Sequence, residues 1–251
     1  MGEELNASVV TGGGLLGDRA YALVDSSDGK VASAKNPRKW PRLFAFRAAL
    51  ADVPKPGASA PPARITLPDG TVVDSTQPDV HRILSEALQR EVTLSTRGGR
   101  AATAEEYWPD IEGRDHRDTV TDFGLPEGTF FDAASVHLLT TATLDRLRAL
   151  YPEGRFEVRR FRPNIVVDTG GQKDFVENAW IGQVLCLGDA VRLRIDGPCP
   201  RCVMTTLAQG DLPSDAGILR TAAQHNLGRV GVYASVLQGG TVRRGDPVRL
   251  E

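Results

Sequence analysis

The chain has 251 residues, of which 41% are hydrophobic and 25% are charged, and its formal net charge is −2. This composition is typical of a folded globular protein with a sizeable core, and the balanced charge excludes a chain-wide basic field for nucleic acid. No apolar run in the sequence approaches a membrane span, and the first ten residues lack the features of a signal peptide. Three cysteines are too few for a disulfide framework and suit a reducing compartment. The sequence thus predicts a soluble cytoplasmic protein that binds neither nucleic acid nor a membrane.

The first hundred residues are predicted to form mainly strands. Pro68-Asp69-Gly70 separates two short apolar runs, which is a hairpin signal. Pro78 then opens a helix, because apolar residues from Val80 to Leu88 recur at helical spacing. The strands expected in this part are residues 20–25, 30–34, 65–67 and 71–73.

Residues 98–129 contain many charges, several glycines and Trp108-Pro109, and they have no clear periodicity. A loop of this length is usually functional or mobile. We therefore expect a long connecting loop here.

The remaining residues alternate between short apolar runs and turn signals. A helix is expected near residues 138–150, and Ser214 is a candidate cap for a helix that ends at Asn226. Many short strands with few helices favour a mainly β, α+β fold with a barrel over a parallel βαβ sheet. The expected strands are residues 164–168, 184–187, 191–195, 232–237 and 248–250.

Two of the three cysteines lie in Cys199-Pro-Arg-Cys202. The spacing is compatible with a redox dithiol, half of a zinc site, two buried core residues, or one thiolate that serves as a ligand. The prolines cannot donate hydrogen bonds to a sheet, so we expect a stiff loop that follows a strand. Arg201 favours a neighbouring thiolate, which is the form that binds metals. On chemistry alone, a ligand thiolate is modestly favoured.

Three further polar clusters are unspecific when each is taken singly. Phe161-Arg162-Pro163-Asn164 follows two arginines, and it is either a solvated basic turn or an anion-binding loop. The glycine-rich residues 12–19 fit neither the Walker pattern nor the dinucleotide fingerprint. Asp132, Ser135 and His137 are compatible with a plain helix entry.

Together and in this order, four motifs resemble the MOSC family: GLLGDRAYALVD at 14–25, FDAASVHLLTTATL at 131–144, RFRPNIVVD at 160–168 and GPCPRCVMTTL at 197–207. This family comprises β-barrel proteins related to the C-terminal part of molybdenum cofactor sulfurase, often preceded by a smaller N-terminal β-barrel module. The resemblance implies an N-terminal module at 1–97, a connecting region at 98–130 and a MOSC barrel at 131–251.

The resemblance also implies a function. In the family's members that reduce amidoximes and other N-hydroxylated compounds, a cysteine that matches Cys202 binds the metal of a molybdenum cofactor, in which molybdopterin carries molybdenum. Cys202 would then be both the metal ligand and the catalytic residue, and the cofactor would sit between the two modules. The implied cofactor-binding residues are Arg19, Asp132, Ser135, Arg162, Asn164, Thr205 and Thr206.

The implied reaction is a two-electron reduction of a small N-hydroxylated substrate. Because the sequence has no ferredoxin-type cysteine cluster, electrons would come from a separate donor protein that is similar to ferredoxin or cytochrome b5. Two alternatives remain open: a sulfur carrier with a persulfide on Cys202, and a non-catalytic protein that binds or delivers the cofactor.

The N-terminus departs from the family pattern. Relatives usually begin with a strand that ends in Pro-Val-Lys-Ser, whose lysine and serine help to bind the pterin phosphate, whereas Met1 of this sequence falls just beyond that point. We expect the natural start to lie further upstream, because loss of that strand would leave an open sheet edge.

Overall fold

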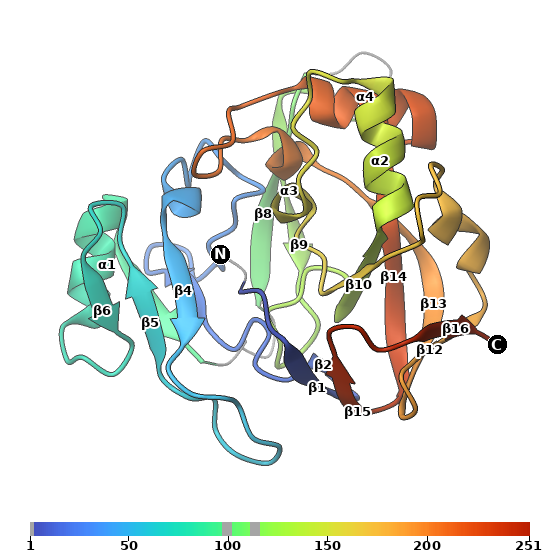
Figure 1. Cartoon of the computed structure of the whole chain (residues 1–251). Coiled ribbons are helices and arrows are strands. Elements are labelled where there is room, and N and C mark those ends of the chain that lie inside the picture. Colours follow the sequence, from blue (N-terminus) through green and yellow to red (C-terminus); the bar gives the residue numbers. More distant parts are fainter. Residues whose placement is uncertain (1–2, 97–101, 111–115) are drawn as a thin grey trace. The chain divides into compact units, whose positions relative to one another are not determined.

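The computed structural model describes residues 3–96, 102–110 and 116–251. Contacts divide the chain into an N-terminal unit, mainly Gly17–Ala133, and a C-terminal unit of Glu4–Leu16 and Ala134–Glu251. The expected mainly β, α+β class is confirmed, because short strands dominate both units (Figure 1). Within the described ranges, every helix is too short or too polar to cross a membrane.

The N-terminal unit contains three small antiparallel sheets and one longer helix. The sheets have the orders β4-β5-β6, β3-β7 and β8-β9, and the side chains of Val80, Leu84 and Leu88 on α1 join a core with Trp40 and Ile65. These helix positions are four residues apart, so they lie on one face. The elements of this unit are β3 (Ala22–Asp25), η1 (Leu43–Ala45), β4 (Arg47–Leu50), β5 (Ala63–Thr66), β6 (Val72–Asp74), α1 (Val80–Leu88), β7 (Val92–Ser95), β8 (Thr103–Trp108) and β9 (Thr119–Gly124).

A curled, half-barrel sheet of six strands forms the centre of the C-terminal unit, in the order β11-β10-β14-β13-β12-β16. Only β10 and β11 pair in parallel, and the long β13 and β14 form the central ladder. A separate three-stranded sheet has the order β15-β1-β2. The strands of this unit are β1 (Ala7–Thr11), β2 (Gly14–Leu15), β10 (Val136–Thr140), β11 (Ile165–Val167), β12 (Val184–Leu187), β13 (Val191–Pro200), β14 (Arg229–Gln238), β15 (Gly240–Arg243) and β16 (Val248–Leu250).

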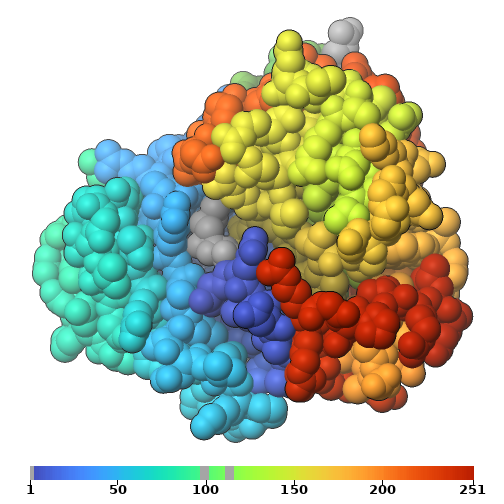
Figure 2. Space-filling view, viewed as in Figure 1, coloured from blue at the N-terminus to red at the C-terminus, as the bar shows by residue number. Residues whose placement is uncertain are grey.

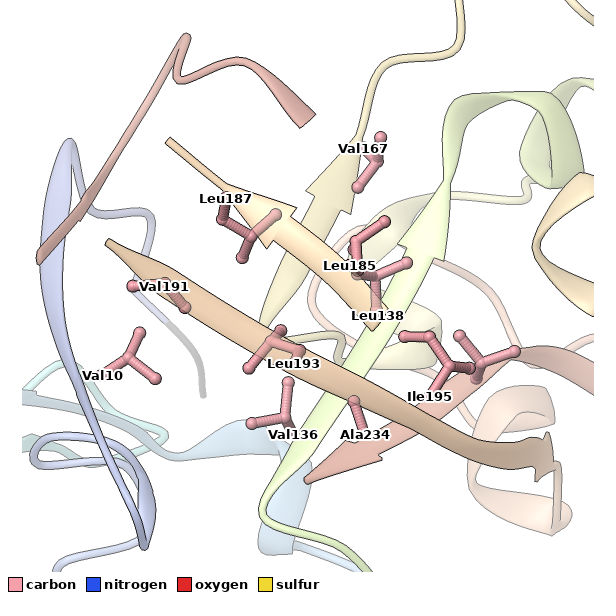
Figure 3. Close-up of a cluster of buried hydrophobic side chains, with 11 residues drawn as sticks. Val10, Val136, Leu138, Val167, Leu185, Leu187, Val191, Leu193, Ile195 and Ala234 are labelled. Carbon is pink, nitrogen blue, oxygen red and sulfur yellow. The ribbon is translucent and has the colours of Figure 1, made fainter. Parts of the chain in front are cut away.

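The core of the C-terminal unit lies inside this curl. Val136, Leu138, Leu193 and Ile195 are at most 1% exposed, and Figure 3 shows side chains from different strands pointing toward one another. A second cluster packs α2, α3 and α4 against β10 and β14. The helices of this unit are α2 (Thr141–Leu150), α3 (Val158–Phe161), η2 (Val176–Trp180), η3 (Val203–Thr206) and α4 (Gly217–Asn226).

The first strand belongs to the C-terminal unit rather than to the expected N-terminal module. β1 pairs with β15 in an antiparallel ladder, and Val10 joins the core beside Val191. Figure 2 shows the dark blue residues of β1 and the red residues of β15 in contact at the surface of this unit. Pairing between the two ends of the chain cannot be inferred from local signals.

Several expected elements agree with the structure and others do not. The 65–73 hairpin, α1, β12 and β16 are confirmed. α4 ends at Asn226 as expected, but it begins at Gly217 after the cap residue Ala216, so Ser214 is not its cap; the Ser214 hydroxyl donates to the Thr206 carbonyl instead. Residues 30–34 are not a strand, since only Val31 makes isolated bridges. The helix expected near 138–150 is wrong in its first part, because β10 continues to Thr140.

Two further corrections concern expected loops. The described part of 98–129 is no plain loop: Thr103–Trp108 and Thr119–Gly124 pair as β8 and β9, while residues 97–101 and 111–115 lie outside the described residues. The segment that leads into Cys202 is not all loop either, since β13 runs through Pro200. Its prolines are tolerated because the ladder shifts register between Ile195 and Gly197 and between Pro198 and Pro200.

A buried carboxylate in the N-terminal unit predicts acid sensitivity. Asp25 is fully buried, and Lys39 Nζ lies 3.0 Å and Arg90 Nη1 3.3 Å from its Oδ2. Burial raises the pKa of Asp25, but hydrogen bonds from Ser27 and Lys39 outweigh it and lower the pKa from 3.8 to about 2. A carboxylate with a depressed pKa stabilises the fold above pH 4, and this contribution is lost as the pH falls toward 2.

We therefore expect Asp25→Asn to lower the free energy of unfolding by about 2 kcal/mol at pH 6. The difference from the wild type should shrink as the pH falls from 4 toward 2. Urea unfolding of both proteins across this range measures it. A difference that stays constant with pH would show that the charge of Asp25 does not stabilise the unit.

Candidate functional site

Cys202 is the one cysteine of the three that is not buried. Cys186 and Cys199 are fully buried inside β12 and β13, whereas the side chain of Cys202 is partly exposed. Cys202 lies in extended backbone directly before the short helix η3. Its carbonyl oxygen accepts hydrogen bonds from the backbone N–H of Thr205 at 3.2 Å and from the Thr205 hydroxyl at 3.1 Å. These bonds fix the turn that presents the thiol.

Arg201 joins the Cys202 segment to the segment that carries Arg162. Its Nη1 donates to Cys199 Sγ at 2.7 Å, and its Nη2 donates to the carbonyl of Phe161 at 2.9 Å. The sequence suggested that Arg201 favours a thiolate. Burial lowers the pKa of Arg201, but the nearby sulfurs of Cys199 and Cys202 outweigh this and raise it. A permanently charged guanidinium therefore lies beside both thiols.

Arg162 follows α3 in a left-handed backbone conformation with φ of 53°. Its N–H donates to the Val158 carbonyl at 3.1 Å, which ends the helix, and Pro163 cannot continue it. Glycine or asparagine usually occupies such a cap, so an arginine here is held at a conformational cost. The exposed Arg162 side chain is suited to binding an anion.

Asn164 is tied to β10 by two hydrogen bonds. Its backbone N–H donates to the His137 carbonyl at 2.8 Å, and its side-chain Oδ1 accepts from the His137 N–H, also at 2.8 Å. The Asn164 side chain therefore aligns the start of β11 with β10, in addition to any contact with a ligand. His137 is itself buried, with Nε2 3.1 Å from the Val230 carbonyl oxygen.

Ser135 precedes β10 and lies against the backbone of Gly14. A Cβ atom at Gly14 would be 2.7 Å from the Ser135 carbonyl oxygen, and Gly14 has φ of +101°. Only glycine fits this close approach and this backbone conformation. The glycine-rich stretch of the sequence thus serves to bring β2 against Ser135.

Thr205 and Thr206 shape η3. Their hydroxyls donate to the carbonyls three residues earlier, Cys202 and Val203, at 3.1 and 2.7 Å. Thr205 is fully buried and Thr206 is partly exposed. We therefore place Thr205 in the support of the turn rather than against a ligand.

Arg19 and Asp132, both expected to bind the cofactor, pair with each other in the N-terminal unit. Arg19 Nη1 lies 2.8 Å from Asp132 Oδ1, and Lys35 Nζ lies 3.0 Å from the other carboxylate oxygen. Burial raises the pKa of Asp132, but the two cations outweigh it and hold the pKa far below its usual range. The Asp132 carboxylate therefore stays ionised and holds the Arg19 side chain in place. Like Arg162, Arg19 has a positive φ, of 49°.

Hydrogen bonds connect the segments that carry the expected residues of the C-terminal unit. Ser135 lies two residues from His137, which binds Asn164; Arg162 follows Phe161, which binds Arg201 beside Cys202. Arg19 and Asp132 belong to the other unit. Sequence reasoning missed Arg160, because a buried arginine and an exposed one look the same in a single sequence. It missed Lys35 because its partner Asp132 is far away along the chain.

The donors around Cys202 do not form a metal site by themselves. Among the described residues, no three His, Cys, Asp or Glu side chains are grouped closely enough to hold a metal ion.

Comparisons with solved structures give only distant likenesses. YuaD from Bacillus subtilis is 18% identical, with 50% of this chain and 69% of that chain covered, and a TM-score of 0.40. YiiM from Geobacillus stearothermophilus is 17% identical (62% and 72% covered, TM-score 0.35), and YiiM from Escherichia coli is 18% identical (47% and 54%, 0.35). Coverage of the solved chains falls as low as 50%, so none of these likenesses establishes an activity.

No curated protein is significantly similar to the chain. The model of the MOSC domain family matches residues 126–249. This range contains β10–β15, the residues Arg162 and Asn164 after α3, and the residues Arg201 and Cys202 before η3. The chain therefore contains a MOSC domain, which spans residues 126–249.

Proposed function

We propose that this protein binds a molybdenum cofactor through Cys202 and catalyses the two-electron reduction of N-hydroxylated compounds. The MOSC domain supports the first part, because this family is associated with molybdenum cofactor binding. The observation that carries the proposal is the partly exposed Cys202, whose neighbour Arg201 donates a hydrogen bond to the Phe161 carbonyl beside Arg162.

The donor set fits this cofactor better than it fits a bare ion. A structural zinc site needs four protein ligands, whereas the described residues offer a single accessible sulfur. A pterin dithiolene brings two sulfurs with the metal, so one protein thiolate is enough to anchor it. Soft sulfur ligands suit a metal that changes its oxidation state.

The residues of the C-terminal unit have distinct roles in this proposal. The Cys202 thiolate would hold the metal, and Arg162, Asn164 and Ser135 would bind the pterin and its phosphate. Guanidinium groups recognise phosphate with paired hydrogen bonds. Arg19 of the N-terminal unit, oriented by Asp132, is a further anion-binding candidate.

When bound, the cofactor supplies the two-electron chemistry, and the chain supplies binding, orientation and charge. The substrate class and the external donor, similar to ferredoxin or cytochrome b5, are part of the proposal. Both follow from the resemblance to the family's N-hydroxylated-compound reductases.

The test is to produce the protein in a host that makes the cofactor and to measure molybdenum and pterin per chain. The purified protein is then assayed with a hydroxylamine or amidoxime and an artificial reductant. We expect about one molybdenum and one pterin per chain, with turnover. A pure, folded protein without molybdenum would refute the proposal.

A persulfide carrier is the second candidate, since the partly exposed thiol of Cys202 suits it equally. It predicts a mass increase of one sulfur atom on the intact protein and no molybdenum. A protein that binds or delivers the cofactor without catalysis would contain molybdenum and pterin but turn over no substrate.

A further inference from the structure

Arg160 of α3 is a buried arginine whose guanidinium binds only backbone carbonyls in the described part of the chain. Its Nη1 donates to Thr205 at 3.1 Å and Leu207 at 3.2 Å, its Nη2 donates to Pro213 at 2.8 Å, and its Nε donates to Arg155 at 2.8 Å. Arg160 is 1% exposed. One side chain thus fastens α3 to three points in residues 203–213, the segment that directly follows Cys202.

Arg201 makes the opposite connection. It starts beside Cys202 and reaches back to the Phe161 carbonyl, at the end of α3, while its guanidinium lies 5.8 Å from the centre of the Phe161 ring. Its backbone N–H donates to the Gly228 carbonyl at 2.8 Å. Each of the two segments therefore sends one arginine to the backbone of the other.

Neither arginine has a carboxylate partner within ion-pair distance among the described residues. Nε of Arg201 is buried without a hydrogen-bond partner, and burial lowers the pKa of Arg160. Desolvating a guanidinium is expensive unless well-placed acceptors replace water. The acceptors here belong mostly to the facing segment, so the desolvated charges stabilise one relative placement of the two segments.

The neighbouring Arg159 behaves differently. Its side chain is 40% exposed and forms ion pairs with Glu157 at 2.9 Å and Asp211 at 2.6 Å. Exposed pairs of this kind contribute little. The pair Arg159 and Arg160 thus offers a matched control and test on consecutive residues.

We propose that Arg160 and Arg201 form a reciprocal clamp that positions Cys202 against the Arg162–Asn164 loop. Both are positioning residues, since their guanidinium groups are occupied by the protein itself. The purpose of the clamp rests on the proposed function, but its existence can be tested without the cofactor.

Hydrogen exchange on the full chain without cofactor is the first test. In Arg160→Met, exchange should accelerate about tenfold or more at the amides of Gln209, Leu212 and Asp215 across the clamp. In Arg201→Met it should accelerate similarly at Arg162 and Asn164. Arg159→Met should leave both segments as in the wild type. Faster exchange only in the mutated segment, or equally throughout the protein, would overturn the clamp.

Molybdenum content is the second measurement. Among variants that fold, Arg201→Met should retain about tenfold less molybdenum than the wild type, whereas Arg159→Met should retain the wild-type amount. Arg201→Lys should not restore it, because one ammonium cannot reach both Cys199 Sγ and the Phe161 carbonyl as the planar fork does. Full restoration by lysine would overturn the geometric basis of the clamp.

The two proposals fail separately. If the variants exchange as expected but the wild type binds no molybdenum, the clamp is upheld and the proposed function is refuted. A wild type loaded with molybdenum whose variants exchange normally would refute the clamp alone. Because Arg201 is less buried than Arg160, its variants keep the test decisive if Arg160→Met does not fold.

Discussion

Replacing Cys202 by alanine is expected to lower molybdenum retention by more than about 100-fold. Removing groups that merely orient a metal ligand typically costs 10–100-fold in metal affinity, so removal of the proposed ligand sulfur itself should cost more. Reductase turnover should fall with the metal. The measurement is molybdenum and pterin per chain after purification, together with the assay of an N-hydroxylated substrate.

The fold should tolerate this change. The Cys202 side chain is partly exposed, and the hydrogen bonds of its turn use its carbonyl rather than its sulfur. Substitutions at such surface positions usually alter the free energy of unfolding by no more than about 0.5 kcal/mol. A loss of metal at unchanged stability therefore isolates the role of the sulfur.

Cys186→Ala is the matched control, because this cysteine is fully buried in β12. It should lower stability modestly through lost packing and leave molybdenum in place. If Cys202→Ala keeps its full molybdenum content, Cys202 is not the ligand, and the proposal loses the observation that carries it.

The elements that could be predicted from sequence have local signals. The hairpin β5–β6 turns at Pro68-Asp69-Gly70, and α1 has apolar residues at helical spacing. β12 is a short apolar run that ends at the turn residues Gly188-Asp189. The hairpin and α1 depend on interactions within a few residues along the chain, whereas β16 pairs with β12, which lies far away in the sequence.

β10 shows where local signals fail. All five of its residues are buried, so the strand has no alternation of apolar and polar residues, and its leucines can equally be counted into the stripe of α2. The true boundary is Thr140, whose hydroxyl accepts a hydrogen bond from the Thr143 N–H and caps α2. Residues 136–140 form a strand because they pair with β14 on one side and with β11 on the other.

The candidate site likewise contains residues that could be predicted from sequence motifs and residues that only the tertiary structure reveals. Cys202, Arg162 and Asn164 could be predicted because they stand in recognisable motifs. The clamp could not, because Arg159 and Arg160 are adjacent and chemically identical, and only the tertiary structure buries one of them. The pairing of Arg19 with Asp132 and Lys35 likewise depends on residues that are far apart in the sequence.

Asn164 is expected to serve both the fold and the ligand, and two substitutions separate these roles. Asn164→Leu removes the acceptor of the His137 N–H, and an unpaired buried donor costs about 2 kcal/mol in the free energy of unfolding. Asn164→Asp keeps an acceptor at the same position, so stability should stay close to that of the wild type. Urea unfolding of the three proteins measures this difference.

The cofactor content of Asn164→Asp should not follow its stability. In Asn164→Asp a carboxylate replaces a neutral amide in the loop proposed to bind a phosphate, and like charges repel, so pterin and molybdenum per chain should fall about tenfold or more. Gln238→Glu, at the exposed end of β14, introduces the same charge elsewhere in the unit and should retain both. If Asn164→Asp is stable and fully loaded, Asn164 only aligns β11 with β10, and the phosphate must be bound by other residues of the C-terminal unit.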